Sequence, residues 1–398
     1  MAISRRDVLL GSAGALGAAS FSFPAPAIAQ SDSIKIGCLA AMTGPSSAPT
    51  IGFNRGVDFA VKAINAAGGV KGRKIEIVMR DTQGDPTKAV NATQEMISQL
   101  KVHGIWGPLN SGEALATTPI MARAKIPDIH PCVVETLIDT TKYPNAFRMA
   151  PSNSQWDDAV RNYCLNVLKV KKIAVLGDTT GYGVTAVGAS VAAFKKDGAD
   201  IVYQANIDAT QPDLTPDMLR AKNAGAEAIV VWSVTTGMEA RMFNTRAVMG
   251  WDVPFVGHPS LSSGEIAGLV EKPENWKKVY AIGYKSCSYD ASGKLPPKSE
   301  ELVARLTKAG VALNDTLLWW VAGGIDAIEL FANAVETSGS TDPVGIITYL
   351  NTVNKYPGYF GTYTFTPTQH NGFPTEEIVM SEASTAKNGT FALAPGYS

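Results

Sequence analysis

Hydrophobic and polar positions follow the same alternation twice along the chain. Between residues 34 and 130, short apolar runs alternate with segments in which apolar residues recur every three or four positions, and a second pass of the same kind covers residues 172–259. Apolar runs separated by helical periods are typical of a parallel sheet with helices on both faces. The pattern therefore predicts an α/β protein with two similar Rossmann-like lobes and a cleft between them, outside the carboxyl ends of the strands.

Several elements of the first pass have recognisable ends. A strand is predicted over 34–40, followed by a helix that ends at Gly68-Gly69. Pro86 suits the first turn of a second helix, and a strand over 102–106 leads through Gly107-Pro108 into a third helix that begins near Ser111. These two strand ends should lie at the cleft edge of the first sheet.

The segments after the second pass complete the lobes. The run 278–284 resembles a strand, and two helices within 295–335 should return to the first lobe, with the apolar stripe of the second one in its core: Trp319, Trp320, Ile325, Ile328, Phe331 and Val335. The tail alternates like antiparallel strands with an Asn371-Gly372 turn. We expect a leader at 1–29, a first lobe of 30–150 and 283–361, and a second lobe of 151–282 and 362–398, joined by a three-segment hinge.

Composition and the amino terminus indicate an exported protein. The 398 residues are 45% hydrophobic and 18% charged with a net charge of −1, as in ordinary folded proteins, and no basic run suggests nucleic acid. Arg5-Arg6 precedes an uncharged stretch that closes with Ala27-Ile28-Ala29, which predicts a cleaved twin-arginine signal peptide; an uncleaved anchor is the alternative. No later segment approaches about 20 apolar residues without charges, so we expect a soluble periplasmic protein.

Motifs for cofactors, metals and disulfides are missing from the sequence. There is no Gly-x-x-x-x-Gly-Lys-Ser/Thr run, no G-x-G-x-x-G after a first strand, and no metal-ligand spacing among the four histidines. The four cysteines are too few for a disulfide scaffold, and the sequence assigns no pair among Cys38, Cys132, Cys164 and Cys287. We therefore expect no cofactor and no metal.

The clearest candidate site is the segment that contains Asn110 and Ser111. Ser111 can cap the helix that follows, and free N–H groups at a helix terminus suit a carboxylate. Plain capping with water in the site is the alternative. The corresponding segment of the second pass contains Thr180 and Tyr182, whose ring offers a flat apolar face with a hydroxyl at its tip.

Two histidines stand at corresponding places in the two passes. His130 and His258 each precede a proline at the end of a predicted strand, so both could line the cleft, or each could be a structural hydrogen-bonding group. Serines beside His258, among them Ser260, also admit a Ser/His hydrolase. However, no G-x-S-x-G elbow is present, and these serines are equally consistent with a loop.

Three segments of the first pass carry a resemblance to a known family. IKIGCLAAMTGP, GVDFAVKAINAAGGVKGRKIEIVMRDTQGDPTKAV and GIWGPLNSGEALA are similar to the periplasmic leucine/isoleucine/valine-binding proteins. The resemblance covers nearly all of the mature chain. It implies a non-enzymatic receptor of an ABC importer that closes around a small ligand and delivers it to a membrane permease. A sensor subunit that docks on a membrane receptor is the alternative.

The resemblance carries over binding residues only in part. It implies that Ser111 and the position of Val134 hold the ligand carboxylate, that the backbone beside Cys132 accepts an ammonium, and that Tyr182 is a cleft aromatic. Five family positions are changed: the ammonium-binding carboxylate falls near Pro259, a cleft tyrosine near Val234, another near Pro49, and a cysteine pair at Gly84 and Asn110. That disulfide should therefore be absent.

These departures predict a different ligand. A buried ammonium without a carboxylate is penalised, so a free amino acid fits poorly unless Asp178 or Glu135 substitutes. We expect an organic carboxylate or amide, including aromatic ones, with branched-chain amino acids next, and Trp106, Trp232 and His258 as walls of the site. The expected ligand-binding residues are Asn110, Ser111, Cys132, Val134, Thr180, Tyr182 and His258. A clamp of this kind does not need to associate, so we expect a monomer.

Overall fold

The first lobe is built on a five-stranded parallel sheet. The computed structural model describes residues 33–44, 46–290 and 292–397, so the predicted leader lies outside the described residues. The strand order is β2-β1-β3-β4-β5, and every neighbouring pair is parallel. The strands are β1 (Ile34–Ala40), β2 (Ile75–Asp81), β3 (Gly104–Trp106), β4 (Asp128–His130) and β5 (Ala146–Arg148). β3 is two residues shorter than predicted.

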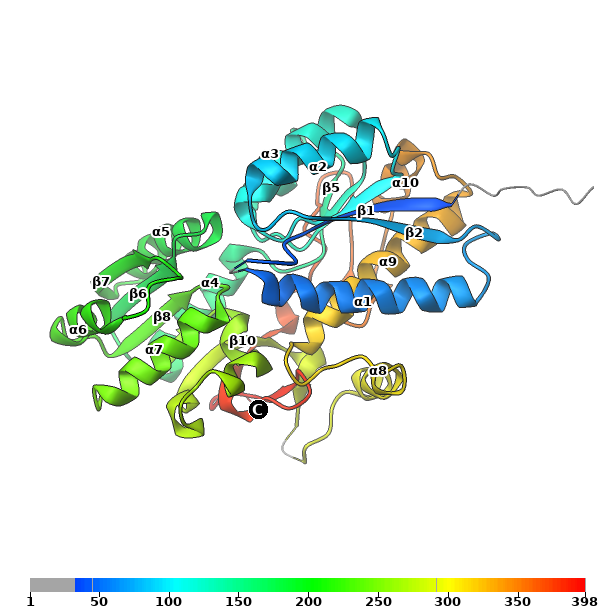
Figure 1. Cartoon of the computed structure of the whole chain (residues 1–398). Coiled ribbons are helices and arrows are strands. Elements are labelled where there is room, and N and C mark those ends of the chain that lie inside the picture. Colours follow the sequence, from blue (N-terminus) through cyan, green and yellow to red (C-terminus); the bar gives the residue numbers. More distant parts are fainter. Residues whose placement is uncertain (1–32, 45, 291, 398) are drawn as a thin grey trace, which may run out of the picture. The chain divides into compact units, whose positions relative to one another are not determined.

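Helices cover both faces of this sheet, as Figure 1 shows. The chain contributes α1 (Ser47–Ala66) and α9 (Leu318–Ser338) to one face, and α2 (Pro86–Ser98) and α3 (Ser111–Ala124) to the other. Side chains of a strand point alternately to the two faces. Accordingly Ile36 and Cys38 pack in the cluster of α1 and α9, whereas Leu39 packs in the cluster of α2 and α3.

Helix α9 is the central helix of the first lobe. Its predicted apolar stripe is buried, and Phe331 reaches the strand residue Gly104. By length and composition alone α9 could cross a membrane, although Asp326 and Glu329 interrupt its apolar run, in line with the expectation that no segment approaches about 20 apolar residues without charges. However, 83% of its most apolar window is buried inside the protein, which is typical of a core helix.

The second lobe is built on a six-stranded sheet. The order is β14-β10-β9-β8-β6-β7, and only β14 runs antiparallel to its neighbour. Its strands are β6 (Lys172–Asp178), β7 (Asp200–Ile207), β8 (Ala228–Trp232), β9 (Phe255–Gly257), β10 (Val279–Tyr284) and β14 (Ile378–Glu382). One face packs against α4 (Asn153–Asn162) and α5 (Gly181–Lys196), the other against α6 (Thr215–Asn223) and α7 (Thr236–Val248).

The chain crosses between the two sheets three times. The first crossing follows β5, the second follows β10, and the third precedes β14. After β10 the chain forms β11 (Ser288–Tyr289), α8 (Pro297–Lys308), α9, α10 (Pro343–Leu350) and the pair β12 (Tyr356–Pro357) and β13 (Thr362–Tyr363); β15 (Phe391–Ala392) pairs with β11. Arg305 of α8 lies over the ring of Phe59 in α1, so α8 packs against α1.

The predicted hairpin turn at Asn371-Gly372 is wrong. Arg148 N donates to His370 O at 2.9 Å and Gly372 N donates to Arg148 O at 3.0 Å, so this segment runs parallel to β5. An Asn-Gly pair forms a hairpin turn only when its two flanking strands pair with each other. Here the open edge of β5 takes one flank instead. We therefore propose that the second lobe resumes after residue 372 rather than at 362.

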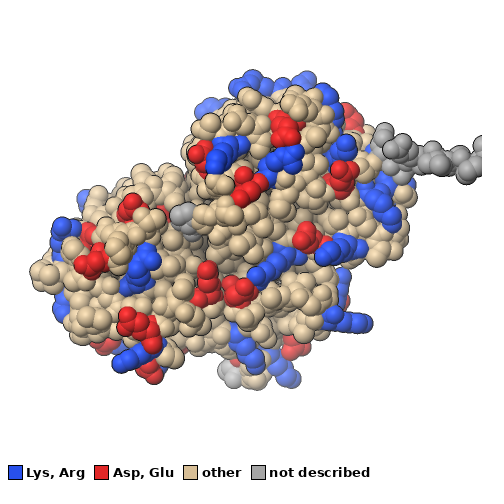
Figure 2. Space-filling view, in the orientation of Figure 1, with Lys and Arg blue, Asp and Glu red and all other residues tan. Residues whose placement is uncertain are grey.

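Charged side chains are mixed over the surface. Figure 2 shows basic and acidic residues interspersed on the face in view, without a broad area of one sign. This agrees with a net charge of −1. Long-range attraction of a highly charged polymer would require a large field of one sign.

Candidate ligand-binding site

A small pocket lies where the strand ends of the two sheets face each other, and its enclosed volume is about 30 Å³. This is far below the roughly 300–1,000 Å³ that is common for small-molecule sites, so a ligand can enter only if the pocket walls move apart. The first lobe contributes Ala41, Ser46, Thr50, Leu109, Asn110, Ser111, Pro131 and Val133, and the second contributes Trp156, Tyr182, Val234 and His258. No lining residue carries a charged side chain, so the pocket is suited to a largely apolar ligand with a few polar groups.

The polar end of the pocket is the start of α3. Asn110 is the cap, because its side chain accepts from Gly112 N at 3.0 Å; the prediction that Ser111 caps the helix is wrong. Ser111 is instead the first helical residue. Its side chain is buried at the pocket, and its hydroxyl accepts only a long contact from the Cys132 thiol, at 3.7 Å. The hydroxyl and the positive end of the helix are therefore available to a carboxylate.

The opposite end of the pocket is aromatic. The ring of His258 lies 5.1 Å from that of Trp156, nearly perpendicular to it, and 5.2 Å from that of Tyr182. Trp156 Nε1 donates to Tyr284 Oη at 2.9 Å, which fixes the indole. Among the described residues, the buried Tyr182 hydroxyl has no hydrogen-bond partner. An unpaired buried hydroxyl is costly, so a ligand that satisfies it would gain affinity.

Thr180 and Asp178 support the loop that carries Tyr182. The Thr180 side chain caps α5 by accepting from Gly183 N at 3.1 Å, and its hydroxyl donates to Asp178 Oδ1. Asp178 Oδ2 accepts from Ser233 Oγ at 3.0 Å and from Val234 N at 3.2 Å. Neither residue is part of the pocket lining, so both position the loop instead of facing a ligand.

The serine beside His258 does not face the pocket. Ser260 is fully buried; its hydroxyl contacts His258 Nδ1 at 2.7 Å, Ser233 O at 3.0 Å and Glu239 Oε1. A serine nucleophile must reach the substrate, and Ser260 is absent from the pocket lining. The arrangement therefore gives the hydrolase hypothesis no support.

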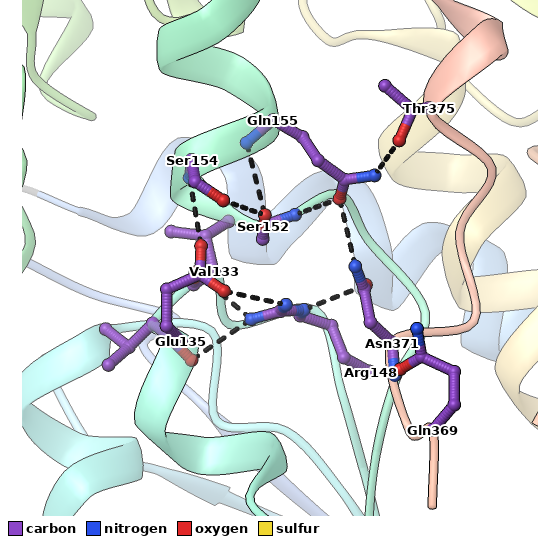
Figure 3. Close-up of polar contacts among 10 residues, drawn as sticks. Val133, Glu135, Arg148, Ser152, Ser154, Gln155, Gln369, Asn371 and Thr375 are labelled. Atoms are coloured by element: carbon purple, nitrogen blue, oxygen red, sulfur yellow. Dashed lines mark hydrogen bonds and ion pairs between the residues drawn. The ribbon is translucent and has the colours of Figure 1, made fainter. Parts of the chain in front are cut away.

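Arg148 connects the segment of Val133 and Glu135 to Asn371, as Figure 3 shows. Its buried guanidinium donates from Nη1 to the carbonyls of Val133 and Val134, at 3.2 and 3.0 Å, and from Nε to Asn371 Oδ1 at 3.2 Å. Nη2 lies 3.5 Å from Glu135 Oε2, and the other oxygen of Glu135 accepts from Ser154 N at the start of α4. Arg148 thus contacts the loop of Val133 and Val134 and the segment of Asn371 directly, and it contacts α4 through Glu135.

The structure brings together four of the seven predicted ligand-binding residues. Asn110, Ser111, Tyr182 and His258 line the pocket, whereas Cys132, Val134 and Thr180 do not. Val133 takes the place expected of Val134. The other suggested walls, Trp106 and Trp232, are buried strand residues outside this pocket, and so is His130.

Sequence reasoning missed Trp156 and Thr50. Trp156 follows a capping box in which Ser152 Oγ accepts from Gln155 N, and the Ser-x-x-Gln signature was readable in the sequence. That signature places the helix start but not the direction of the indole. Thr50 lies in the first turns of α1, in a loop-to-helix segment where no motif indicated a role.

Neither proposed substitute for the family carboxylate faces the pocket. Asp178 and Glu135 make the contacts described above and are absent from the lining. Pro259 opens a short 3₁₀ turn. In the described ranges no group of three or more His, Cys, Asp or Glu could hold a metal, and the four cysteines are free and buried.

Because several acidic side chains are buried, we expect the free energy of unfolding to fall as the pH rises through 7 to 8. Burial raises the pKa of Glu113 and Asp326 to about 7 and of Asp128 to about 8. These folded-state carboxyls keep protons that the unfolded chain loses near pH 4, so folding weakens as pH rises through 7 to 8. Burial lowers the pKa of His130 and His258 to about 3 and of His370 to about 4, which opposes this trend only below about pH 6.5.

The free energy of unfolding should therefore decrease by roughly 2–4 kcal/mol between pH 6.5 and 8.5, at about 1.4 kcal/mol per proton and pH unit. Urea unfolding at several pH values measures it. Asp128→Asn should flatten the part of the curve near pH 8, because an amide does not titrate there. The substitution keeps the hydrogen bond, because the amide oxygen can still accept from Thr118 Oγ1. A stability that rises over this interval would contradict the prediction.

The comparisons with known proteins agree with this architecture. The family model described as periplasmic binding protein matches residues 33–388. Leu/Ile/Val-binding protein homolog 3 from Brucella melitensis is 24% identical over 369 residues, which cover 91% of this chain and 94% of that protein. The sequence resemblance to periplasmic receptors is thus confirmed at the level of the family.

Solved structures share the fold at low identity. The branched-chain amino acid transporter substrate-binding protein LivJ from Streptococcus pneumoniae, in complex with isoleucine, has a TM-score of 0.77 at 24% identity, covering 91% of this chain and 99% of its own. An ABC transporter solute-binding protein from R. palustris, in complex with 4-hydroxybenzoate, has a TM-score of 0.74 at 22% identity, covering 91% and 96%. With two doubly wound lobes, a pocket at their strand ends and a family match over nearly all described residues, the chain belongs to the periplasmic binding protein family.

Proposed function

We propose that the protein is the extracytoplasmic substrate-binding protein of an ABC importer and that it captures a small aromatic carboxylate. The observation that carries this proposal is the composition of the pocket: among the described residues, it has a helix terminus with a serine hydroxyl that makes only a long contact with the Cys132 thiol at one end, an aromatic wall at the other and no charged lining residue. Such a site offers donors for a carboxylate and apolar surface for a ring.

The pocket is poorly suited to a free amino acid. An α-ammonium group needs acceptors, and a carboxylate is the strongest of them. No carboxylate lines the pocket, and the carbonyls of Val133 and Val134 already accept from Arg148. An ammonium buried there would lose its hydration without full compensation, which costs several kcal/mol.

Both ligand classes occur on this fold. The S. pneumoniae structure contains isoleucine and the R. palustris structure contains 4-hydroxybenzoate. The fold alone therefore does not choose between them, and the pocket residues favour the aromatic acid. Trp156 and Tyr182 present the flat apolar surface that a ring requires.

Capture by closure follows from the division of the site between the lobes. A carboxylate would bind Ser111 and the α3 terminus in the first lobe, and the ring would complete its contacts with Trp156 and His258 in the second. Only contacts that differ between open and closed forms can shift their populations, and a nearly complete shift takes about 5.5 kcal/mol. We propose that the leader at 1–29 directs export of the protein to the periplasm. The closed monomer then docks there on a membrane permease.

A thermal-shift panel followed by calorimetry tests the ligand class. The panel contains benzoate, 4-hydroxybenzoate, leucine, isoleucine, valine and phenylalanine. An aromatic acid at 100 times its dissociation constant should add about 2.7 kcal/mol to stability. Strong stabilisation by leucine together with no response to the aromatic acids would refute the proposal.

Ser111→Ala should weaken binding of the aromatic acid by about 10- to 100-fold, because one hydrogen bond to a charged group contributes roughly 1.5–3 kcal/mol. Folding should be nearly unchanged, since Ser111 neither caps α3 nor makes a short hydrogen bond. Calorimetry measures the affinity, with Ser98→Ala on the exposed side of α2 as the control. Equal affinity for wild type and Ser111→Ala would show that the carboxylate binds elsewhere.

A further inference from the structure

The hydrogen bonds of His258 determine which ring nitrogen carries its proton. The backbone N–H of Ser260 donates to His258 Nδ1 at 3.1 Å. A backbone N–H can only donate, so Nδ1 must accept and cannot itself be protonated. The proton of the neutral imidazole is therefore on Nε2.

The surroundings of the ring keep it neutral. His258 is 4% exposed, and burial lowers its pKa to about 3. In the described part of the chain no hydrogen bond to Nε2 is formed, and the ring lines the pocket between Trp156 and Tyr182. At neutral pH the second-lobe wall thus presents one N–H donor.

Ser260 and Glu239 hold this tautomer from behind. The Ser260 hydroxyl lies 2.7 Å from Nδ1 and is hydrogen-bonded to Glu239 Oε1 on the first turn of α7. Glu239 is fully buried, and burial raises its pKa well above the usual value. Burial thus disfavours the charged form of this carboxyl, which opposes a negative charge that would draw a second proton onto the imidazole.

We propose that His258 is a specificity-determining residue whose Nε2–H donates to an oxygen at the end of the ligand remote from its carboxylate. This inference rests on the proposed function and narrows it to aromatic acids that carry a ring hydroxyl. A hydroxyl can accept from His258 and also pair with the unpartnered Tyr182 hydroxyl, which donates or accepts. An apolar substituent of the same size would leave both groups unpaired.

The tautomer can be tested without any ligand. Two-bond ¹H–¹⁵N correlation spectra of protein labelled at histidine, with His258→Gln to assign the signal, should show His258 protonated on Nε2 only at pH 7. A signal from an Nδ1–H tautomer or from an imidazolium would overturn the inference while leaving the proposed function intact.

The specificity is tested with 4-hydroxybenzoate and 4-methylbenzoate as probes. Calorimetry on the wild type should show at least 10-fold tighter binding of the hydroxy acid. His258→Gln should retain this preference, because the glutamine amide nitrogen can occupy the position of Nε2. His258→Asn should lose most of it, because its amide ends near the position of Nδ1. His103→Asn, in the first lobe outside the pocket, is the control and should behave as wild type.

Two results would overturn the assigned role. Equal binding of the two acids by the wild type would show that no donor reads the ring substituent, and an unchanged preference in all variants would show that another residue does. If the wild type binds neither acid although Nε2 is protonated, the aromatic-acid proposal itself is wrong, and the specificity assigned to His258 fails with it.

Discussion

Replacing Gly324 with alanine is expected to destabilise the protein severely. A Cβ atom on Gly324 would lie 2.0 Å from Phe53 O and 3.1 Å from Val57 N, and one on Gly56 would lie 1.9 Å from Val321 O. Helices α1 and α9 therefore approach backbone to backbone, and no side-chain movement can relieve the overlap. Because α9 is the central helix of the first lobe, the two helices would have to separate along their shared core.

The expected loss is at least about 3 kcal/mol, the upper part of the range for overpacked cores. Urea unfolding followed by circular dichroism measures it. Gly188→Ala is the matched control, because a Cβ there meets no atom within 4 Å and alanine favours a helix over glycine by about 1 kcal/mol. If Gly324→Ala unfolds at the same urea concentration as the control, the two helices do not pack in this way.

Gly181→Val should reduce ligand affinity by roughly 10- to 100-fold, an effect of about 1.4–2.8 kcal/mol. In the structure the start of α5 in the second lobe meets the start of α3 in the first: a Cβ on Gly181 would lie 3.1 Å from both Cα and N of Gly112. The additional methyl groups of valine would have no room there. The lobes would have to remain further apart, so the contacts that closure adds would be lost.

Calorimetry with the tightest ligand of the panel measures this affinity, and small-angle scattering reports whether the ligand still compacts the protein. Gly112→Ala is a control on the facing helix, because its Cβ would meet only Asn110 Oδ1 at 3.5 Å and Pro86 Cγ at 3.7 Å. It should bind almost as the wild type does. Undiminished affinity in Gly181→Val would mean that the bound form does not include this contact.

The repeated pattern of apolar strands and helical periods was sufficient to predict the two lobes. β1 spans the predicted residues 34–40, α2 begins at Pro86, and the α9 stripe is buried as expected. These features follow from local preferences and from the period of the hydrophobic positions, which the sequence contains directly. The same repeat pointed to His130 and His258 at corresponding strand ends, but only His258 lines the pocket, and His130 is buried outside it.

Errors of one residue had local causes. Asn110 and Ser111 are both good cap residues, and only the backbone path after β3 decides which of them caps α3. Likewise, adjacent side chains of an extended segment point in opposite directions, so a shift of one residue exchanges Val133 and Val134. In the folded protein Arg148, which comes from another strand, holds both carbonyls of that segment.

The sequence by itself determined the fold class, the family and several element ends in the first lobe, because these depend on periodicity and on neighbouring residues. Only the tertiary structure decided that Trp156 lines the pocket, that residues 370–372 extend the first sheet and that His258 offers a donor. Each of these depends on a contact between segments distant in sequence or on the direction of a single hydrogen bond. Such contacts are selected by packing of the whole chain and leave no periodic signal in the sequence.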